Sequence, residues 1–217
     1  MPANTFTILL GGTLEPTDRL KAQVAGTRAI AADGGMRHAA ALGIRPELWV
    51  GDFDSSDDLP VADYPDIPRM PYPARKNATD GEIAVDAARE RGASRIILAG
   101  ALGGERSDHA LMHLIAMVAL SKAGLDITLS SGAEEAYPLL PGMPLAVDLP
   151  QGALFSVIGL TALTGLTIAD ARYPLSDFTL PFGSSRTISN VAEGPVTFSL
   201  GSGEAIVLAR PHDLTGA

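Results

Sequence analysis

Apolar and polar positions follow different patterns in the two halves of this 217-residue chain. From Thr5 to about Gly132, short β-rich runs alternate with Ala-rich segments of helical composition. This order is typical of an α/β domain with a largely parallel, Rossmann-like sheet. The predicted strands are Phe6 to Leu10, Arg28 to Ala32, Glu47 to Val50, Arg95 to Ala99 and Asp126 to Leu129. The predicted helices are Met36 to Leu42, Gly81 to Arg91 and Ser107 to Ala123.

The pattern changes after Glu134. The segment Glu134 to Pro150 contains Pro138, Pro141, Pro144 and Pro150, which favours an irregular connection with little helix. Beyond it, β-rich runs separated by Gly-containing turns predict a small antiparallel β-sandwich. These runs are Leu154 to Leu160, Arg186 to Ser189, Val196 to Leu200 and Ala205 to Ala209. We therefore expect an α/β domain over residues 1–132, a Pro-rich connection over 133–150 and a β-sandwich over 151–217.

Composition narrows the functional classes. The net charge of −9 disfavours a general nucleic-acid or anionic-membrane surface, because phosphate backbones need clustered Lys and Arg. Without cysteine, the chain has no disulfide, thiolate zinc site or cysteine nucleophile. Its start lacks the pattern of a signal peptide, and the longest apolar segment, Ala110 to Leu120, is too short to span a bilayer. We expect a cytoplasmic protein without a membrane partner.

Two carboxylates follow the predicted strand Glu47 to Val50 in the sequence GDFDSS. Asp52 and Asp54 are two residues apart at this strand end. Such a pair is costly unless a divalent cation or hydrogen-bond donors neutralise it. An exposed loop with a following helix cap is the alternative explanation, and it is less favoured because the acids directly follow an apolar strand. The pattern predicts magnesium ligands.

Other acids occupy comparable positions. Asp33 follows a predicted strand, and ligands of open α/β sheets collect at the carboxyl ends of strands. The sequence Asp33-Gly34-Gly35 is typical of a tight turn, but its glycines would equally allow close approach of a nucleotide. Asp80 follows Thr79, which forms a predicted capping box with Glu82. That box leaves the Asp80 carboxylate available for a metal.

A glycine-rich turn, Gly100 to His109, joins a predicted strand to a predicted helix. Backbone N–H groups and the positive end of the helix dipole suit it to phosphate, with Arg106 able to form a forked contact. Asp108 could instead be an ordinary acid of the first helical turn. We interpret His113, one helical turn after His109, as a partly buried residue rather than a metal ligand.

The motifs DGG, GIRPELWVGDFDS, KNATDGEIA, GALGGERSDH, YPL and ISN occur in this order, and together they resemble the thiamine pyrophosphokinase family. The similarity spans nearly the whole chain, and GDFDS, TDGE and the GG-R-DH turn are its most specific parts. The resemblance implies an α/β nucleotide-binding catalytic domain followed by a thiamine-binding β-sandwich. It also implies a homodimer with thiamine bound between the subunits.

The resemblance assigns roles to matching positions. It implies that Asp52, Asp54 and Asp80 bind magnesium and that Ser189 and Asn190 bind thiamine. Residues implied to contact ATP are Asp33, Gly34, Lys76, Thr79, Gly103, Arg106 and His109. Those implied to act in catalysis are Asp54, Arg106 and Asp108, with Asp108 orienting or deprotonating the acceptor alcohol. Three positions depart from the family pattern: Asn77, Glu105 and Val191.

The expected reaction is pyrophosphoryl transfer from ATP to the hydroxyethyl oxygen of thiamine, which gives thiamine diphosphate and AMP. Its barrier would be lowered mainly by alignment and by neutralisation of phosphate charge. Three alternatives remain open. One is the same transfer to another hydroxymethyl heterocycle such as a pterin, another is a metal-dependent nucleotide-sugar glycosyltransferase, and the third is a non-catalytic sensor of thiamine or nucleotide.

Overall fold

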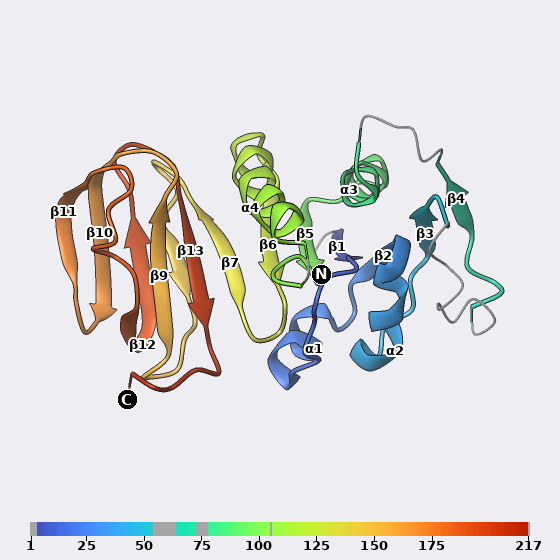
Figure 1. The fold of residues 1–217 in the computed structure, drawn as a ribbon, viewed down its shortest axis with the longest axis horizontal. Helices are drawn as coiled ribbons and strands as arrows, with labels where there is room; N and C mark the ends of the chain where they lie inside the picture. The colour runs from blue at the N-terminus through green and yellow to red at the C-terminus, as the bar shows by residue number, and fades with distance from the viewer. Residues whose placement is uncertain (1–3, 54–63, 73–77, 105, 217) are drawn as a thin grey trace. The chain divides into compact units, whose positions relative to one another are not determined.

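The computed structural model describes residues 4–53, 64–72, 78–104 and 106–216. The chain forms two compact units, which Figure 1 shows in blue to green and in yellow to red for most of their length. The first unit comprises Met1–His113 and Leu125–Gly132, and the second comprises Leu114–Gly124 and Ala133–Ala217. None of the helices among the described residues is long and apolar enough to cross a membrane.

The first unit contains a parallel sheet in the strand order β4-β3-β2-β1-β5-β6. Its strands are β1 (Thr5–Leu9), β2 (Arg28–Ala32), β3 (Leu48–Gly51), β4 (Arg69–Pro71), β5 (Arg95–Ala99) and β6 (Asp126–Ser130). Strand interiors are buried, as expected where both faces of a parallel sheet are covered. The strand order reverses between β1 and β5, so the loops after them part at this point and leave room for a ligand.

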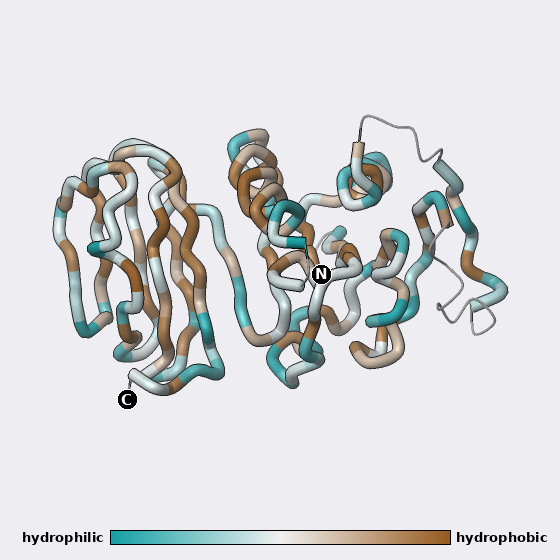
Figure 2. Tube along the Cα trace, viewed as in Figure 1, coloured by the Kyte–Doolittle hydropathy of each residue, from teal (hydrophilic) through white to brown (hydrophobic). Residues whose placement is uncertain are grey.

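Helical segments connect these strands. They are α1 (Asp18–Val24), the 3₁₀ helix η1 (Asp33–His38), α2 (Ala39–Leu42), α3 (Asp80–Glu90) and α4 (Ser107–Lys122). Helix α3 buries Ile83, Ala84, Val85, Ala87 and Ala88. Figure 2 shows the apolar residues of α4 in brown along much of the helix.

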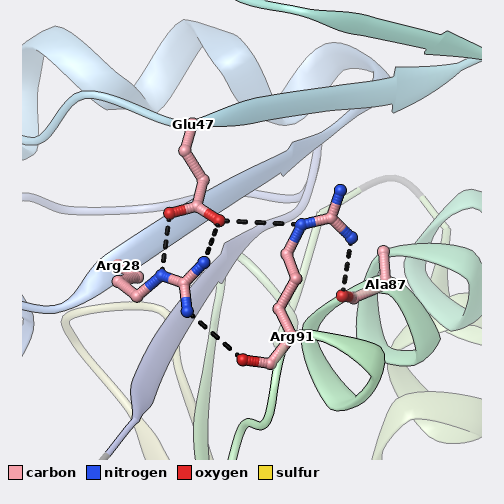
Figure 3. A network of polar contacts seen from close by, with 4 residues as sticks. All are labelled: Arg28, Glu47, Ala87 and Arg91. Carbon is pink, nitrogen blue, oxygen red and sulfur yellow. Dashed lines mark hydrogen bonds and ion pairs between the residues drawn. The ribbon is translucent and has the colours of Figure 1, made fainter.

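A network of charged side chains ties together three segments of the first unit (Figure 3). Arg28 makes a forked contact to Glu47, with Nε to Oε2 at 2.8 Å and Nη2 to Oε1 at 2.6 Å. Arg91 places its Nε 3.7 Å from Oε1 of the same carboxylate and donates from Nη1 to the Ala87 carbonyl. The network joins the start of β2, the chain before β3 and the end of α3, away from the strand ends that form the pocket described below.

The predicted α/β architecture is confirmed, with differences in detail. Predicted strands Arg28 to Ala32 and Arg95 to Ala99 match β2 and β5. The predicted helix Met36 to Leu42 is instead divided between η1 and α2, because the chain already turns at Asp33. Helix α1 and strand β4 were not predicted, since each is too short to show a period.

The second unit is antiparallel. Its strands follow the order β7-β13-β9-β12-β10-β11, with β8 also paired to β12. They are β7 (Glu135–Leu139), β8 (Leu145–Val147), β9 (Leu154–Gly159), β10 (Leu163–Ala171), β11 (Leu175–Leu180), β12 (Asn190–Ser199) and β13 (Ala205–Arg210). Inward-facing residues form one apolar cluster, in which the Phe155 and Phe198 rings meet edge to face at 5.4 Å.

The antiparallel character of this unit is confirmed, whereas one predicted strand is wrong. Residues Arg186 to Ser189 belong to the loop between β11 and β12. In that loop the buried Thr187 hydroxyl donates to the Val157 carbonyl at 2.6 Å, and the Val157 N–H donates to the Thr187 carbonyl. Strands β10 and β11 were not predicted. Residues 133–150 include β7 and β8, whose extended form is set by pairing with distant β13 and β12.

Candidate functional site

A pocket of about 710 Å³ lies within the first unit, where strands of the parallel sheet end. Its walls come from the loops after β1, β2 and β5 and from the first turns of α3 and α4. This is the position expected for a ligand site in an open α/β sheet. Of the residues predicted to bind nucleotide or metal, Asp33, Gly34, Thr79, Asp80, Gly103, Arg106 and His109 line it.

Asp33 is held at the pocket by its backbone. Its φ of +40° is a left-handed conformation that is uncommon for a residue other than glycine. The Trp49 indole Nε1 donates to the Asp33 carbonyl at 2.9 Å, which stabilises this turn from the buried face of β3. Gly51 allows the close packing, because a Cβ there would lie 3.2 Å from the Asp33 Cα. Trp49 itself is fully buried.

The two glycines after Asp33 have different surroundings. A Cβ at Gly35 would lie 2.1 Å from the Leu9 carbonyl oxygen, so this glycine is required for η1 to pack against β1. Gly34 lies under Arg37, whose Nη2 would be 2.5 Å from a Cβ at that position. The glycine pair therefore serves the close packing of η1, and Gly34 also reaches the pocket wall.

Two pocket residues with basic side chains, Arg37 and His38, were not predicted from the sequence. Arg37 donates from Nε to the Gly34 carbonyl at 2.7 Å, which directs a guanidinium toward the pocket. His38 donates from Nε2 to the Gly12 carbonyl at 2.9 Å, and burial lowers the pKa of its imidazole. The sequence signal that could have identified them is an arginine followed by a histidine, two residues after the Asp33-Gly34-Gly35 turn.

The glycine-rich turn after β5 is paired with a second loop. The Gly12 N–H donates to the Gly100 carbonyl at 3.2 Å, and a Cβ at Gly12 would lie only 2.4 Å from that oxygen. Gly100 itself has φ +80° and packs against the Leu10 carbonyl. Two chain segments therefore meet backbone to backbone at the pocket, and this close packing requires glycine at both positions.

The predicted capping box at the start of α3 is confirmed. The Thr79 hydroxyl accepts from the Glu82 N–H at 3.3 Å, and Glu82 Oε2 accepts from the Thr79 N–H at 2.7 Å. Asp80, the first residue of α3, lines the pocket and takes no part in the box. Its carboxylate lies in the first turn of the helix, where a negative charge interacts favourably with the helix dipole.

Arg106 and Asp108 form a forked ion pair at the start of α4. Arg106 Nε donates to Oδ1 at 3.0 Å and Nη2 donates to Oδ2 at 2.8 Å. This pairing holds the pKa of the Asp108 carboxyl well below its usual range. A carboxylate with a pKa this low is a weak base. It also occupies the edge of the Arg106 guanidinium that the sequence suggested would bind phosphate.

His109 and His113 extend along the same helix face, with ring centroids 6.3 Å apart. His113 is half-buried and donates from Nδ1 to the Ala101 carbonyl at 3.0 Å, and burial lowers the pKa of its imidazole. The prediction of a packed histidine is confirmed.

The carboxylates suggested as metal ligands are only partly covered by the structure. Asp52 follows β3 and is half-buried. Asp54, Lys76, Asn77 and Glu105 lie outside the described residues. Within the described ranges, no group of three or more His, Cys, Asp or Glu side chains could hold a metal ion.

Ser189 and Asn190 lie in the second unit and differ in accessibility. Ser189 is exposed, has φ +57° and donates its N–H to the Ser156 hydroxyl at 3.0 Å. Asn190 is only 4% exposed, and its side chain bonds to the backbone of Tyr173 and Val191. Val191 is buried in β12, so this departure from the family pattern is a core position.

Family models match both halves of the chain. The thiamin pyrophosphokinase catalytic domain matches residues 23–129, and the thiamin pyrophosphokinase vitamin B1 binding domain matches residues 145–204. The pocket residues from Ala32 to His113 fall within the first match, and Ser189 and Asn190 fall within the second. A comparison with curated protein sequences gives no match.

Solved structures share the fold over nearly the whole chain. The thiamine pyrophosphokinase from Bacillus subtilis is 25% identical with a TM-score of 0.82, covering 95% of this chain and 98% of that one. The thiamin pyrophosphokinase from Geobacillus thermodenitrificans is 28% identical with a TM-score of 0.78, covering 95% and 97%. The enzyme from Candida albicans, 11% identical with a TM-score of 0.75 over 95% and 89%, shows a common fold only.

Proposed function

Because the chain belongs to the thiamin pyrophosphokinase family, we propose that it transfers the pyrophosphoryl group of ATP to thiamine, giving thiamine diphosphate and AMP. The observation that carries this proposal is the presence of both family domains on one chain, with the pocket at the strand ends of the first. The α/β domain over residues 1–132 would then be catalytic, and the β-sandwich over 151–217 would bind thiamine.

In this reaction the thiamine hydroxyl oxygen attacks the β-phosphorus of ATP. A bond forms between them, the bond from the β-phosphorus to the oxygen bridging the α-phosphorus breaks, and AMP leaves with that oxygen. The hydroxyl proton passes to water. Catalysis therefore depends on alignment and on charge stabilisation rather than on a covalent intermediate. Asp108 would orient the hydroxyl, because an aspartate carboxylate is a weak base at neutral pH.

The pocket supplies polar groups suited to the nucleotide. The glycine-rich turns at Gly12 and Gly103 line the pocket without side chains, and Arg37 adds a positive charge beside Gly34. We also assign nucleotide contacts to Asp33, Gly34, Lys76, Thr79, Gly103, Arg106 and His109. Arg106 would exchange its fork with Asp108 for phosphate oxygens when ATP binds.

We assign Mg²⁺ to Asp52, Asp54 and Asp80. Carboxylate oxygens are hard ligands, and Mg²⁺ is usually held by one or two carboxylates together with waters and substrate phosphates. Two of these acids lie in the described part of the chain, Asp52 directly after β3 and Asp80 at the start of α3, and their carboxylate chemistry fits Mg²⁺. When bound, the ion would neutralise charge on the phosphate oxygens.

A product assay tests the function. Purified protein, ATP, magnesium and thiamine should give AMP and thiamine diphosphate in equal amounts, resolved by chromatography. ADP with thiamine monophosphate would mean attack at the γ-phosphorus. Turnover only with a pterin, consumption of a sugar nucleotide without ATP, or binding without turnover would each favour one of the alternatives predicted from the sequence.

Two further expectations belong to this proposal. The family resemblance implies a homodimer, which sedimentation of the purified chain would measure. A cytoplasmic location stays a prediction from the sequence, and fractionation of the source cells would test it.

A further inference from the structure

The backbone on both sides of Asp52 is constrained. Before it, Gly51 packs so closely on the pocket wall that a Cβ there would lie 3.4 Å from Oδ1 of Asp33. After it, Phe53 has φ +59°, a left-handed conformation that is strained for a bulky side chain. A strained residue persists only where its surroundings hold it. The direction of the Asp52 carboxylate therefore depends on the contacts that Phe53 makes.

The Phe53 ring is supported from the interior by Trp49. The two rings meet edge to face, with centroids 5.4 Å apart and planes at 79°. Trp49 is fully buried, and its indole donates to the Asp33 carbonyl, so this support is itself fixed to the pocket wall. Phe53 also packs against the apolar cluster of the first unit.

A cation from the neighbouring strand completes this arrangement. Arg69 begins β4 and is the register partner of Trp49 in β3. Its guanidinium carbon lies 5.3 Å from the centroid of the Trp49 ring and 5.6 Å from that of the Phe53 ring. Both distances are within the range of a cation–π contact. No carboxylate among the described residues forms an ion pair with Arg69.

Arg69 is separate from the pocket itself, because it is not one of the residues that line it. The two rings that it covers are connected to the site. Trp49 holds Asp33 of the pocket wall, and Phe53 directly follows Asp52. A change at Arg69 can therefore reach the site through these rings.

We propose that Arg69 is a positioning residue that acts through Phe53. Its guanidinium keeps the Phe53 ring on Trp49, and the left-handed turn at Phe53 then holds the Asp52 carboxylate in one direction at the end of β3. This inference rests on the proposed function, because it deepens the assignment of Asp52 to Mg²⁺. A guanidinium suits this role since it is planar, weakly hydrated and able to stack on aromatic faces.

The Mg²⁺ dependence of turnover tests the inference. Arg69→Met removes the charge and keeps an unbranched apolar side chain. It should raise the half-saturating Mg²⁺ concentration about fivefold, the upper end of what an exposed cation–π contact supports. The kcat at saturating Mg²⁺ and the thiamine KM should be unchanged. Arg69→Lys should recover part of the loss, because an ammonium is also attracted to a ring face.

A second readout does not need turnover. Equilibrium dialysis with labelled ATP, without thiamine and over a series of Mg²⁺ concentrations, should show the same fivefold shift in Arg69→Met. Thermal unfolding of the same variants separates this effect from a loss of folding, because a merely structural role would lower the unfolding temperature without moving the Mg²⁺ dependence. Arg69→Lys supplies the comparison if Arg69→Met does not fold.

A double-mutant cycle tests the route through Phe53. Phe53→Leu removes the ring face and keeps an apolar side chain, so it should raise the half-saturating Mg²⁺ concentration in the same direction. Adding Arg69→Met to Phe53→Leu should give no further rise, because the guanidinium then has no Phe53 ring to hold.

Arg45→Met is the matched control. Arg45 is another exposed arginine of the first unit over an aromatic ring, with its guanidinium carbon 5.9 Å from the Tyr64 centroid and an ion pair to Asp66 at 3.7 Å. It does not line the pocket. The Mg²⁺ dependence should be unchanged in this variant.

Two results would overturn the inference. An unchanged Mg²⁺ dependence in Arg69→Met would mean that its charge does not position Asp52. A further rise when Arg69→Met is added to Phe53→Leu would mean that Arg69 acts on the bound phosphates or metal without Phe53. A wild-type chain that binds ATP with Mg²⁺ but makes no thiamine diphosphate would instead reject the proposed function, and the dialysis would still test the role of Arg69.

Discussion

Candidate residues of the first unit directly follow strand ends or begin helices, whereas Tyr173 and Asn190 of the second unit are 17 residues apart and meet through side-chain hydrogen bonds. In a parallel sheet, topology alone brings the ends of successive strands to one edge. In an antiparallel unit, a loop takes its shape from whichever strand it packs on. The first arrangement suits chemistry at several converging groups, and the second suits recognition by a shaped surface.

The largest effect should come from the acids after β3. Asp54→Asn should reduce turnover on the order of 100-fold, because it removes a proposed magnesium ligand, and Asp52→Asn should act in the same direction. The free energy of unfolding and the thiamine KM should change little. Steady-state kinetics and urea unfolding would measure these quantities.

Asp86→Asn is the matched control for this prediction, because Asp86 is an exposed acid of α3 that pairs with Arg89 at 3.6 Å and does not line the pocket. Near-normal turnover in Asp54→Asn would remove Asp54 from the metal site. A large change in thiamine KM would mean that the first unit also recognises the acceptor.

A smaller effect is expected from the arginine that the sequence did not suggest. Arg37→Met should raise the ATP KM about tenfold, because it removes a charge that lines the pocket beside Gly34. Arg89→Met, on the exposed face of α3, should leave it unchanged. ATP titrations at saturating thiamine would show the difference, and an unaltered ATP KM in Arg37→Met would leave only its structural bond to the Gly34 carbonyl.

Substitution of Thr79 tests how far the pocket of the first unit depends on the helix cap at the start of α3. Thr79→Ala should lower the free energy of unfolding by about 1 kcal/mol, because α3 loses its N-cap, and Thr79→Ser should restore most of it. Urea unfolding measures both variants. The nucleotide contact proposed for Thr79 is measured separately by the ATP KM. Weaker ATP binding in Thr79→Ala with no change in stability would mean that the hydroxyl serves only the nucleotide and that the cap is dispensable.

The smallest effect concerns pH. The Arg106 fork keeps the pKa of Asp108 well below its usual range, so Asp108 carries its charge throughout pH 5 to 9. Asp108→Asn should therefore reduce kcat/KM without moving any acid limb in that interval. Burial lowers the pKa of His38, so its imidazole becomes protonated only at a lower pH than an ordinary histidine does. If the pH profile shows an acid limb, His38→Asn is the variant expected to move it. If the acid limb of the kcat/KM profile is lost in Asp108→Asn, Asp108 is the base that accepts the hydroxyl proton.

Prediction from the sequence succeeded where a feature depends on neighbouring residues. The Thr79–Glu82 capping box needs four consecutive positions, and the structure contains it. The Arg28 to Ala32 strand needs only a short apolar run. The same approach failed for Arg186 to Ser189, which has strand composition but forms a loop because Thr187 bonds to β9.

The sequence by itself determined the two-part architecture, the acids placed after strand ends and the start of α3, because periodicity and helix caps are set within a few residues. Only the tertiary structure decided that Arg37 lines the pocket and that Asn190 fixes the Tyr173 turn. These features depend on which side chains become neighbours when distant strands pair. Packing of the whole unit decides which of these side chains come within contact distance, and no local pattern of residues encodes it.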